Sequence, residues 1–284
     1  MNGLSKLAEP PIFVPDRALI EELISLPLQG SANIEFRAGI SSRARVLLDY
    51  DTLKAGAERS VECDLYLEAG ACIDVFHVLQ EEDRGLKLNA KIRYHLKKHA
   101  SLNVWTYVGG AELSRIGQQI FFEEEHGFAS LRGLSLLDGR SESYHQLQAF
   151  HAKGYGISRQ FYKSVLAGEA RSGFDSLVSV AKDASHSDSK QLNKNLILSP
   201  SARAYSRPEL RIQTDDVSCS HGSATGELSE DELFYLRSRG LSRDKARFMM
   251  IEGFAEEILE DESFAPLKER LTGSARKKIA RLME

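Results

Sequence analysis

The chain has 284 residues and a formal net charge of −4 at pH 7; 42% of its residues are hydrophobic and 27% are charged. This length is sufficient to bury a substantial core, as one large or two small domains. The slightly acidic balance argues against a nucleic-acid-binding protein. Because the sequence contains no run of about eighteen apolar residues, we expect no membrane-spanning segment.

The N-terminal segment, residues 1–30, is expected to contain one short helix. Apolar residues between Asp16 and Leu26 share one helical face, Asp16 can cap the helix, and Pro27 can end it. The first residues, MNGLSKLAEPPIF, lack the apolar stretch of a secretory signal. The three cysteines form no CxxC pair, so a reducing, cytoplasmic location is the simplest interpretation.

Residues 31–226 are expected to form a large β structure, because apolar and polar residues alternate there. The stretch 86–96 is the clearest case, with one apolar face and one face rich in lysine and arginine. Similar segments begin at Ala71, Ala100 and Ala129, which are equally spaced along the chain. This recurring spacing favours a β-solenoid core, although periodicity alone leaves a β-sandwich open.

Two polar residues in the last part of this core, Cys219 and His221, are candidate metal or cluster ligands. They are two residues apart on an extended segment, so their side chains point to the same side. Thiolate and imidazole are suitable ligands for iron, zinc or the edge of a cluster. A cluster needs about four ligands, so the others would have to come from another chain or from distant rungs. The alternative is that Cys219 is a small buried apolar residue and that His221 forms a hydrogen bond within a turn.

Other cysteines and histidines are expected to be structural. His95 and His99 lie at the end of an alternating strand, where four residues span about 13 Å, which is too far for one shared metal ion. Cys63 and Cys72 are separated by a predicted turn, and nothing adds a third ligand to them. We therefore expect them to be buried thiols.

The sequence indicates a protein that is not an enzyme. It contains no activated-serine elbow, no phosphate-binding loop of the P-loop type and no HExxH, which argues against hydrolysis of ATP or of proteins. Asp215, Asp216 and Glu227 flank the Cys/His segment and can do acid–base work, bind a cation or cap turns.

Residues 227–284 are expected to form a C-terminal helical domain, because the apolar period changes to that of a helix. Ser229 followed by Glu232 indicates a capping box at the start of the first helix. Gly240 can end that helix and Ser242 can cap the next one. A third helix carries basic residues that we expect to be solvated: Lys268, Arg270, Arg276, Lys277, Lys278 and Arg281.

The helical domain has more apolar surface than one packing contact requires. The second helix has a stripe with the spacing of one helical face, formed by Ile251, Phe254, Ala255 and Ile258. We expect a partner-binding surface here, made of side chains that bury large areas in interfaces: Phe234, Tyr235, Arg237, Arg239, Phe248, Met249 and Ile251. The alternative is that these residues form the domain's own core.

Several ordered motifs resemble the SufB/SufD family, the scaffold proteins of Suf iron–sulfur cluster assembly. They are DDVSCSHGSATGEL (215–228), FYLRSRG (234–240) and a helix that ends in GFAEEIL. Two upstream stretches match the same family in order, FYKSVLAGEARSGFDSLVSV (161–180) and QLNKNLILSPSARAYSRPEL (191–210). The resemblance is close over 144–260 and weak before that.

The resemblance implies a β-helix core and a subunit of the SufD type. SufB-type chains carry an essential cysteine further upstream, and the corresponding stretch here, Asn195 to Leu210, contains none. A SufD-type chain is implied to offer a histidine at the position of His221, at its interface with SufB. The nascent iron–sulfur cluster would be transient or shared between subunits.

The resemblance also implies partners. The helical domain would dock SufC, an ABC-type ATPase, so that ATP acts only through that partner, and a cysteine desulfurase system would be involved indirectly. One alternative is a minimal homodimeric scaffold that itself holds the cluster. A more remote alternative is a β-solenoid enzyme acting on polysaccharides, with Asp215 and Asp216 as its catalytic carboxylates. The single tryptophan argues against it, because such enzymes usually bind sugars on exposed aromatic side chains.

Overall fold

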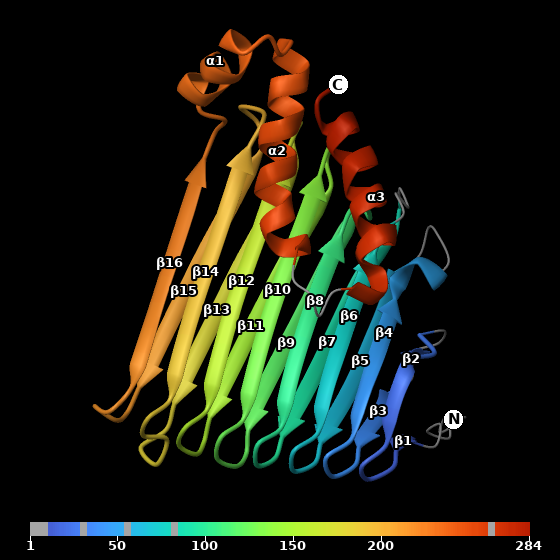
Figure 1. Ribbon diagram of the computed structural model, residues 1–284, viewed down its shortest axis with the longest axis vertical. Coiled ribbons are helices and arrows are strands. Elements are labelled where there is room, and N and C mark those ends of the chain that lie inside the picture. Colours follow the sequence, from blue (N-terminus) through green and yellow to red (C-terminus); the bar gives the residue numbers. More distant parts are fainter. Residues whose placement is uncertain (1–10, 29–32, 54–57, 81–84, 261–264) are drawn as a thin grey trace, which may run out of the picture.

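The computed structural model describes residues 11–28, 33–53, 58–80, 85–260 and 265–284. Successive strands alternate between two parallel eight-stranded sheets, which form a flattened β-solenoid (Figure 1). Sheet A contains β1 (Ile12–Val14), β3 (Asn33–Ala38), β5 (Glu58–Leu67), β7 (Lys87–Leu96), β9 (Leu113–Phe122), β11 (Glu142–His151), β13 (Arg171–Val180) and β15 (Arg203–Ile212). Sheet B contains β2 (Leu19–Ser25), β4 (Arg43–Asp49), β6 (Cys72–Leu79), β8 (Ser101–Val108), β10 (Phe128–Leu137), β12 (Ile157–Leu166), β14 (Asp188–Ile197) and β16 (Ser218–Gly226).

The core lies between the two sheets, and the alternation of the sequence positions it. In β7 the inward residues Leu88, Ile92 and Leu96 are buried, whereas the outward Lys87 and Lys91 are exposed. Parallel strands of a solenoid stack each inward row on the next, so each rung buries the apolar face of its neighbour. The predicted β-solenoid is therefore confirmed.

The equal spacing predicted for the repeated segments is correct for the first pair and wrong for the second. Cys72 lies opposite Ser101, as equal spacing requires, but Ser101 lies opposite Phe128. Ala129 consequently pairs with Leu102 and not with Ala100. The second interval is shorter because β8 and β9 are joined by residues 109–112, whereas the preceding rung uses 80–86 for the same connection.

The predicted N-terminal helix between Asp16 and Leu26 is wrong. This segment is the strand β2, which pairs in parallel with β4. Ile20 and Ile24 pack against the core of the solenoid, so the edge of β4 and this apolar surface outweigh a weak local helical preference. Asp16 does not cap a helix; its carboxylate accepts a hydrogen bond from the Ile40 amide at 2.8 Å. Residues 1–10 of the same predicted segment lie outside the described residues.

Three helices follow β16: α1 (Glu230–Ser238), α2 (Arg243–Leu259) and α3 (Ala265–Leu282). The predicted caps are present, because Ser229 Oγ accepts from the Glu232 amide and Ser242 Oγ from the Lys245 amide, both at 3.3 Å. Gly240 has φ +91° and follows the end of α1. None of the described helices is long and apolar enough to cross a membrane.

Helices α2 and α3 lie on the outer face of sheet B (Figure 1). They share an apolar cluster with outward side chains of its strands, among them Phe76, Trp105, Leu134 and Val165. Lys163 of β12 anchors α2: its buried ammonium donates to the Phe254 carbonyl at 2.6 Å and forms an ion pair with Glu257. Burial lowers the pKa of Lys163, and the Glu257 carboxylate opposes that shift.

Candidate functional site

β15 and β16 form the last rung of the solenoid among the described residues. Among the described strands, β15 pairs only with β13 and β16 only with β14, so both end strands present unpaired backbone groups on their outer edges (Figure 1). An unpaired edge of this kind is a template for another chain. Inward side chains that would be buried in an earlier rung are partly exposed here, such as Leu210 and Cys219.

The two candidate ligands lie on the inner face of this last rung. Cys219 is opposite Ser189, and His221 is opposite Gln191; both partners are buried inside the solenoid. Opposite residues of a parallel pair share a face, so the prediction that the two side chains point to one side is confirmed. Cys219 packs partly against the core, whereas His221 is exposed and its Nδ1 lies 3.2 Å from the Pro208 carbonyl oxygen.

The interior behind these two positions is polar, which the sequence reasoning missed. His151 Nε2 lies 2.9 Å from Ser158 Oγ, which donates to Ser189 Oγ at 2.8 Å in the row of Cys219. In the row of His221, Gln191 donates to Ser176 at 2.6 Å, and Ser176 donates to Gln160. Several buried polar atoms of this interior have no hydrogen-bond partner among the described residues: His145 Nδ1, His151 Nδ1, Gln160 Nε2 and Gln191 Oε1. Such groups need water or a further partner.

Cys219 and His221 by themselves do not form a complete metal site. Among the described residues, no group of three or more His, Cys, Asp or Glu side chains is placed to hold a metal ion. Burial raises the pKa of the Cys219 thiol, so a metal that binds there must displace its proton. Further ligands for a shared ion or cluster would have to come from outside this chain.

The histidine pair is packed into two separate columns of stacked rings. His95 is stacked between the rings of Tyr66 and Phe121, and its Nδ1 lies 2.8 Å from Glu123. His99 belongs to a different column of rings, and its ring is stacked on that of His126. The two histidines therefore do not converge on one metal ion, as the sequence predicts.

Cys63 and Cys72 are free thiols in different sheets. Cys63 is fully buried, and this burial raises the pKa of its thiol to about 12. The prediction of a buried thiol is confirmed for Cys63, whereas Cys72 is only half-buried.

The acidic residues do not form one site. Asp215 and Asp216 are exposed in the turn before β16, and Asp216 forms an ion pair with His186 at 3.0 Å. Glu227 follows the other end of β16, and a strand of this length separates it from the aspartates by about 30 Å. No observation on the described residues favours a carboxylate pair for sugar hydrolysis.

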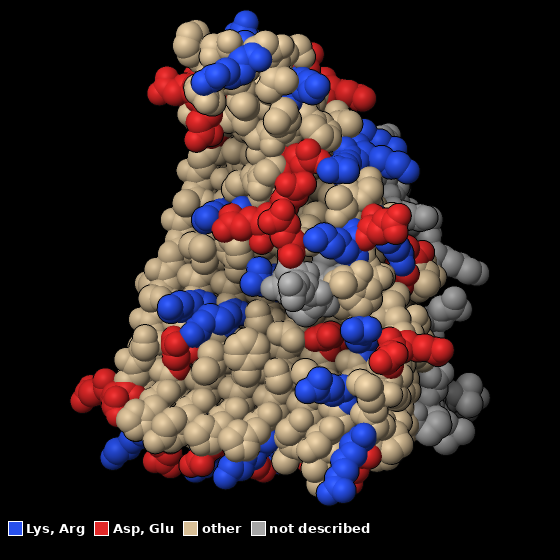
Figure 2. Space-filling view, viewed as in Figure 1, with Lys and Arg blue, Asp and Glu red and all other residues tan. Residues whose placement is uncertain are grey.

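The basic residues of α3 are not only a solvated face, contrary to the prediction. Arg270 binds Asp49 and Asp51 beside β4, and the buried Lys278 donates to Asp138 at 2.8 Å. These contacts fix α3 to the solenoid. Figure 2 shows Lys and Arg interspersed with Asp and Glu over this side of the molecule, without a broad patch of one sign.

The predicted docking residues divide into exposed and buried sets. Phe234, Tyr235 and Met249 are 72%, 57% and 44% exposed, and Arg239 covers the Tyr235 ring at 5.3 Å. Arg237 is also exposed, and Phe248 packs partly against the helix–sheet cluster. Ile251 is a wrong prediction, because its side chain is completely buried in that cluster. The inner stripe of α2 faces sheet B, and its opposite side remains available together with α1.

A family model for the core domain of SufBD proteins, from the SUF system of FeS cluster assembly, matches residues 31–254. The chain belongs to the SufBD family. It is similar to the iron–sulfur cluster assembly protein SufD of Escherichia coli, at 37% identity over 134 residues, which are 44% of this chain and 32% of that protein.

Two further SufBD proteins of iron–sulfur cluster assembly show how far the similarity extends. One from Synechocystis is 39% identical over 164 residues, covering 57% of this chain and 36% of that protein. One from Mycobacterium tuberculosis is 28% identical over 250 residues, covering 85% of this chain and 62% of that protein. The chain thus spans less than two thirds of each of these relatives.

Proposed function

We propose that this SufBD protein is a SufD-like, non-catalytic scaffold subunit of a cytoplasmic iron–sulfur cluster assembly complex. The observation that carries the proposal is the uncapped last rung, with two unpaired strand edges and with Cys219 and His221 on its inner face. A chain that supplies only part of a ligand set, on a surface suited to pairing, fits a shared site better than a complete one. The similarity to SufD supports the same role.

Pairing would use the edges of β15 and β16, with a SufB-like chain as the partner. Backbone groups on these edges can extend each sheet into a second chain. His221 is the more accessible ligand, because it is exposed, whereas Cys219 is partly buried and its thiol, whose pKa is raised by that burial, must lose a proton to bind a metal. The nascent cluster would then be bound transiently between the two subunits, with sulfur supplied indirectly through a cysteine desulfurase.

The helical domain would dock a SufC-like ABC ATPase. Phe234 and Tyr235 on α1 and Met249 on α2 form an exposed apolar surface beside Arg237 and Arg239. Aromatic and arginine side chains of this kind dominate the energetics of protein interfaces. ATP would enter the cycle only through this partner, whose movement would be transmitted through α2 to the solenoid.

The docking surface can be tested by co-purification of the chain with its ATPase subunit. Phe234→Asp combined with Met249→Asp should abolish binding, because two charges would be buried in an apolar contact. Tyr155→Asp is a matched control, since Tyr155 is an exposed aromatic residue in a distant turn. Persistent binding by the double variant, with unchanged thermal unfolding, would show that the ATPase docks elsewhere.

A homodimeric scaffold that holds the cluster itself is the second candidate. Each chain places one thiol and one imidazole on the inner face of its last rung, so two copies would supply about the four ligands that a cluster requires. Anaerobic reconstitution of the isolated protein with iron and sulfide separates the two candidates. A stable cluster that is lost in His221→Ala and retained in His99→Ala would favour the homodimer, and no cluster would favour the heterodimer.

A further inference from the structure

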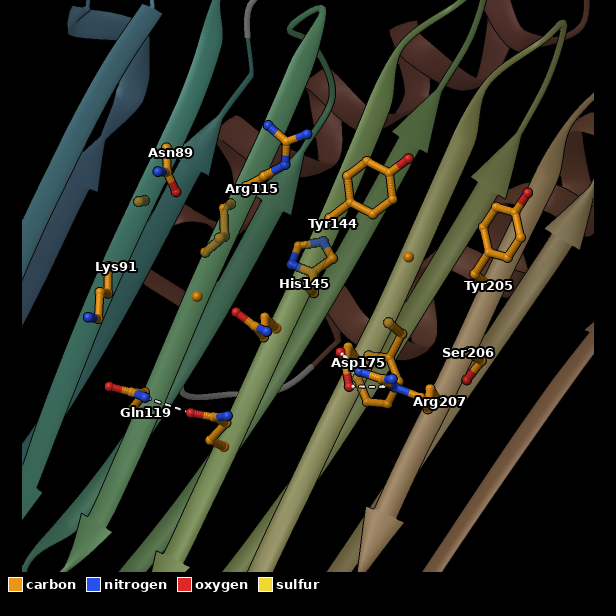
Figure 3. Close-up of a pocket in the computed structure, with 17 residues that line it drawn as sticks. Asn89, Lys91, Arg115, Gln119, Tyr144, His145, Asp175, Tyr205, Ser206 and Arg207 are labelled. Carbon is orange, nitrogen blue, oxygen red and sulfur yellow. Dashed lines mark hydrogen bonds and ion pairs between the residues drawn. The ribbon is translucent and has the colours of Figure 1, made fainter.

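A groove of about 750 Å³ crosses the outer face of sheet A, on the side of the solenoid away from the helices (Figure 3). It runs over β7, β9, β11, β13 and β15. Adjacent strands lie about 4.8 Å apart, so the groove is about 19 Å long. None of the proposed roles of the last rung or of the helical domain uses this surface.

One end of the groove is a hollow at Gly117, flanked by two positively charged side chains. Gly117 has no side chain and lies between Lys91 on β7 and Gln146 on β11. Arg115, two residues earlier on β9, shares the outer face with Gly117. Lys91 and Arg115 are both exposed, and neither forms an ion pair within the described ranges; Glu62, opposite Lys91 on β5, is paired with Arg93. Arg207, further along the groove, differs because it is paired with Asp175.

The other end of the groove carries two tyrosine rings beside the Asp175–Arg207 ion pair. The Tyr144 ring lies over Gly173, where an added Cβ would approach the Tyr144 Cδ1 to 2.4 Å. Tyr205 occupies the neighbouring position on β15 and is 59% exposed. The Arg115 guanidinium lies 5.9 Å from the centre of the Tyr144 ring and so links the two ends. Figure 3 shows Arg115, Tyr144 and Tyr205 along one side of the groove.

We propose that this groove is a binding site for an organic anion with a planar ring system. The anionic group would lie over Gly117 between Lys91 and Arg115, and the ring would pack on Tyr144 and Tyr205. From β9 to β15 is three strand spacings, about 14 Å, so the ligand is the size of an aromatic carboxylate or of a phosphate ester of a planar base. The excess of positive charge here, in a chain of net charge −4, makes anions the complementary ligands.

Fluorescence titration of the full chain with anilinonaphthalene sulfonate tests the site, because this probe is a planar apolar anion. Gly117→Leu should weaken binding at least tenfold by filling the hollow. The variant should fold, since a Cβ at Gly117 would meet only the Ala90 carbonyl, at an ordinary 3.6 Å. Lys91→Gln combined with Arg115→Gln should weaken binding about tenfold, because each solvent-open ion pair contributes up to about a factor of five.

Lys98→Gln combined with Lys182→Gln is the matched control, because it removes the same charge from exposed turns outside the groove. Undiminished binding by Gly117→Leu would overturn the proposal, as would equal effects of the two double variants. Competition then identifies the anionic group: displacement by adenosine monophosphate indicates a phosphate ester, and displacement by naphthoate indicates a carboxylate. Displacement by neither, or by inorganic phosphate as readily as by the nucleotide, would also overturn it.

Discussion

Acid should unfold this protein through three histidines that are buried inside the solenoid. Burial lowers the pKa of His77 to about 3 and the pKa values of His145 and His151 to about 4. Unfolded imidazole has a pKa of about 6.5. Between these values the unfolded chain takes up protons that the folded protein does not bind. The free energy of unfolding therefore falls as the pH falls below about 6.5.

The size of the effect follows from the difference in pKa. At pH 5 all three histidines are still neutral in the folded protein. Each therefore lowers the free energy of unfolding by about 2 kcal/mol relative to pH 8, since one pH unit corresponds to about 1.4 kcal/mol. Together they account for about 6 kcal/mol, which is comparable with the whole stability of many domains. A pronounced loss of stability between pH 6.5 and pH 5 is expected.

Urea unfolding at pH 8 and pH 5, followed by circular dichroism, measures this loss. His77→Gln should reduce the difference between the two pH values by about 2 kcal/mol, although it also lowers stability at pH 8 by disturbing the hydrogen bonds of His77 to Tyr50 and Tyr94. His99→Gln is the control, because His99 is exposed in a turn. Equal pH dependence in His77→Gln and in the unmodified chain would refute the reasoning.

Two substitutions test the packing of the sheets and helices. Gly133→Ala should lower the free energy of unfolding by about 1–3 kcal/mol, because its Cβ would lie 2.2 Å from the buried Tyr162 ring. Gly253→Ala should stabilise α2 slightly, because the space around Gly253 is open. Chemical denaturation compares the two variants, and equal effects would contradict the argument. Arg270→Ala should cost at most about 1 kcal/mol but should speed amide hydrogen exchange in α3, since it releases the contacts with Asp49 and Asp51; unchanged exchange would show that apolar packing alone holds the helix.

The sequence was sufficient to predict the features that depend on local chemistry. Alternation in β7 and the hydroxyl caps at Ser229 and Ser242 each act within a few residues, so their patterns are visible without a partner. The position of Cys219 and His221 on one face follows from the same local geometry.

Features that depend on distant segments were not predictable. The stretch Leu19–Ser25 has a helical pattern, and only the edge of β4 makes it a strand. Ser158 and Gln160 are polar residues next to Arg159, so nothing in their local pattern indicates that they face inward while the arginine faces outward. Ile251 lies in an apolar helix, and whether it meets sheet B or a partner depends on which side of α2 is buried.

The change of interior chemistry along the solenoid implies a gradient of local stability. Early rungs bury aliphatic side chains such as Val46, Leu65 and Val75, whereas the last rungs bury serine, glutamine and asparagine and have no neighbour beyond β16 among the described strands. In a stack held by nearest-neighbour contacts, fraying starts at the rung with the weakest and fewest contacts. The rung that carries Cys219 and His221 should therefore open more readily than the aliphatic rungs in the middle of the stack, and any molecule that covers it restricts that opening. Binding of a molecule at this end consequently has an entropic cost. The affinity of that molecule can therefore be tuned by substitutions that stiffen the final rung without contacting the bound molecule.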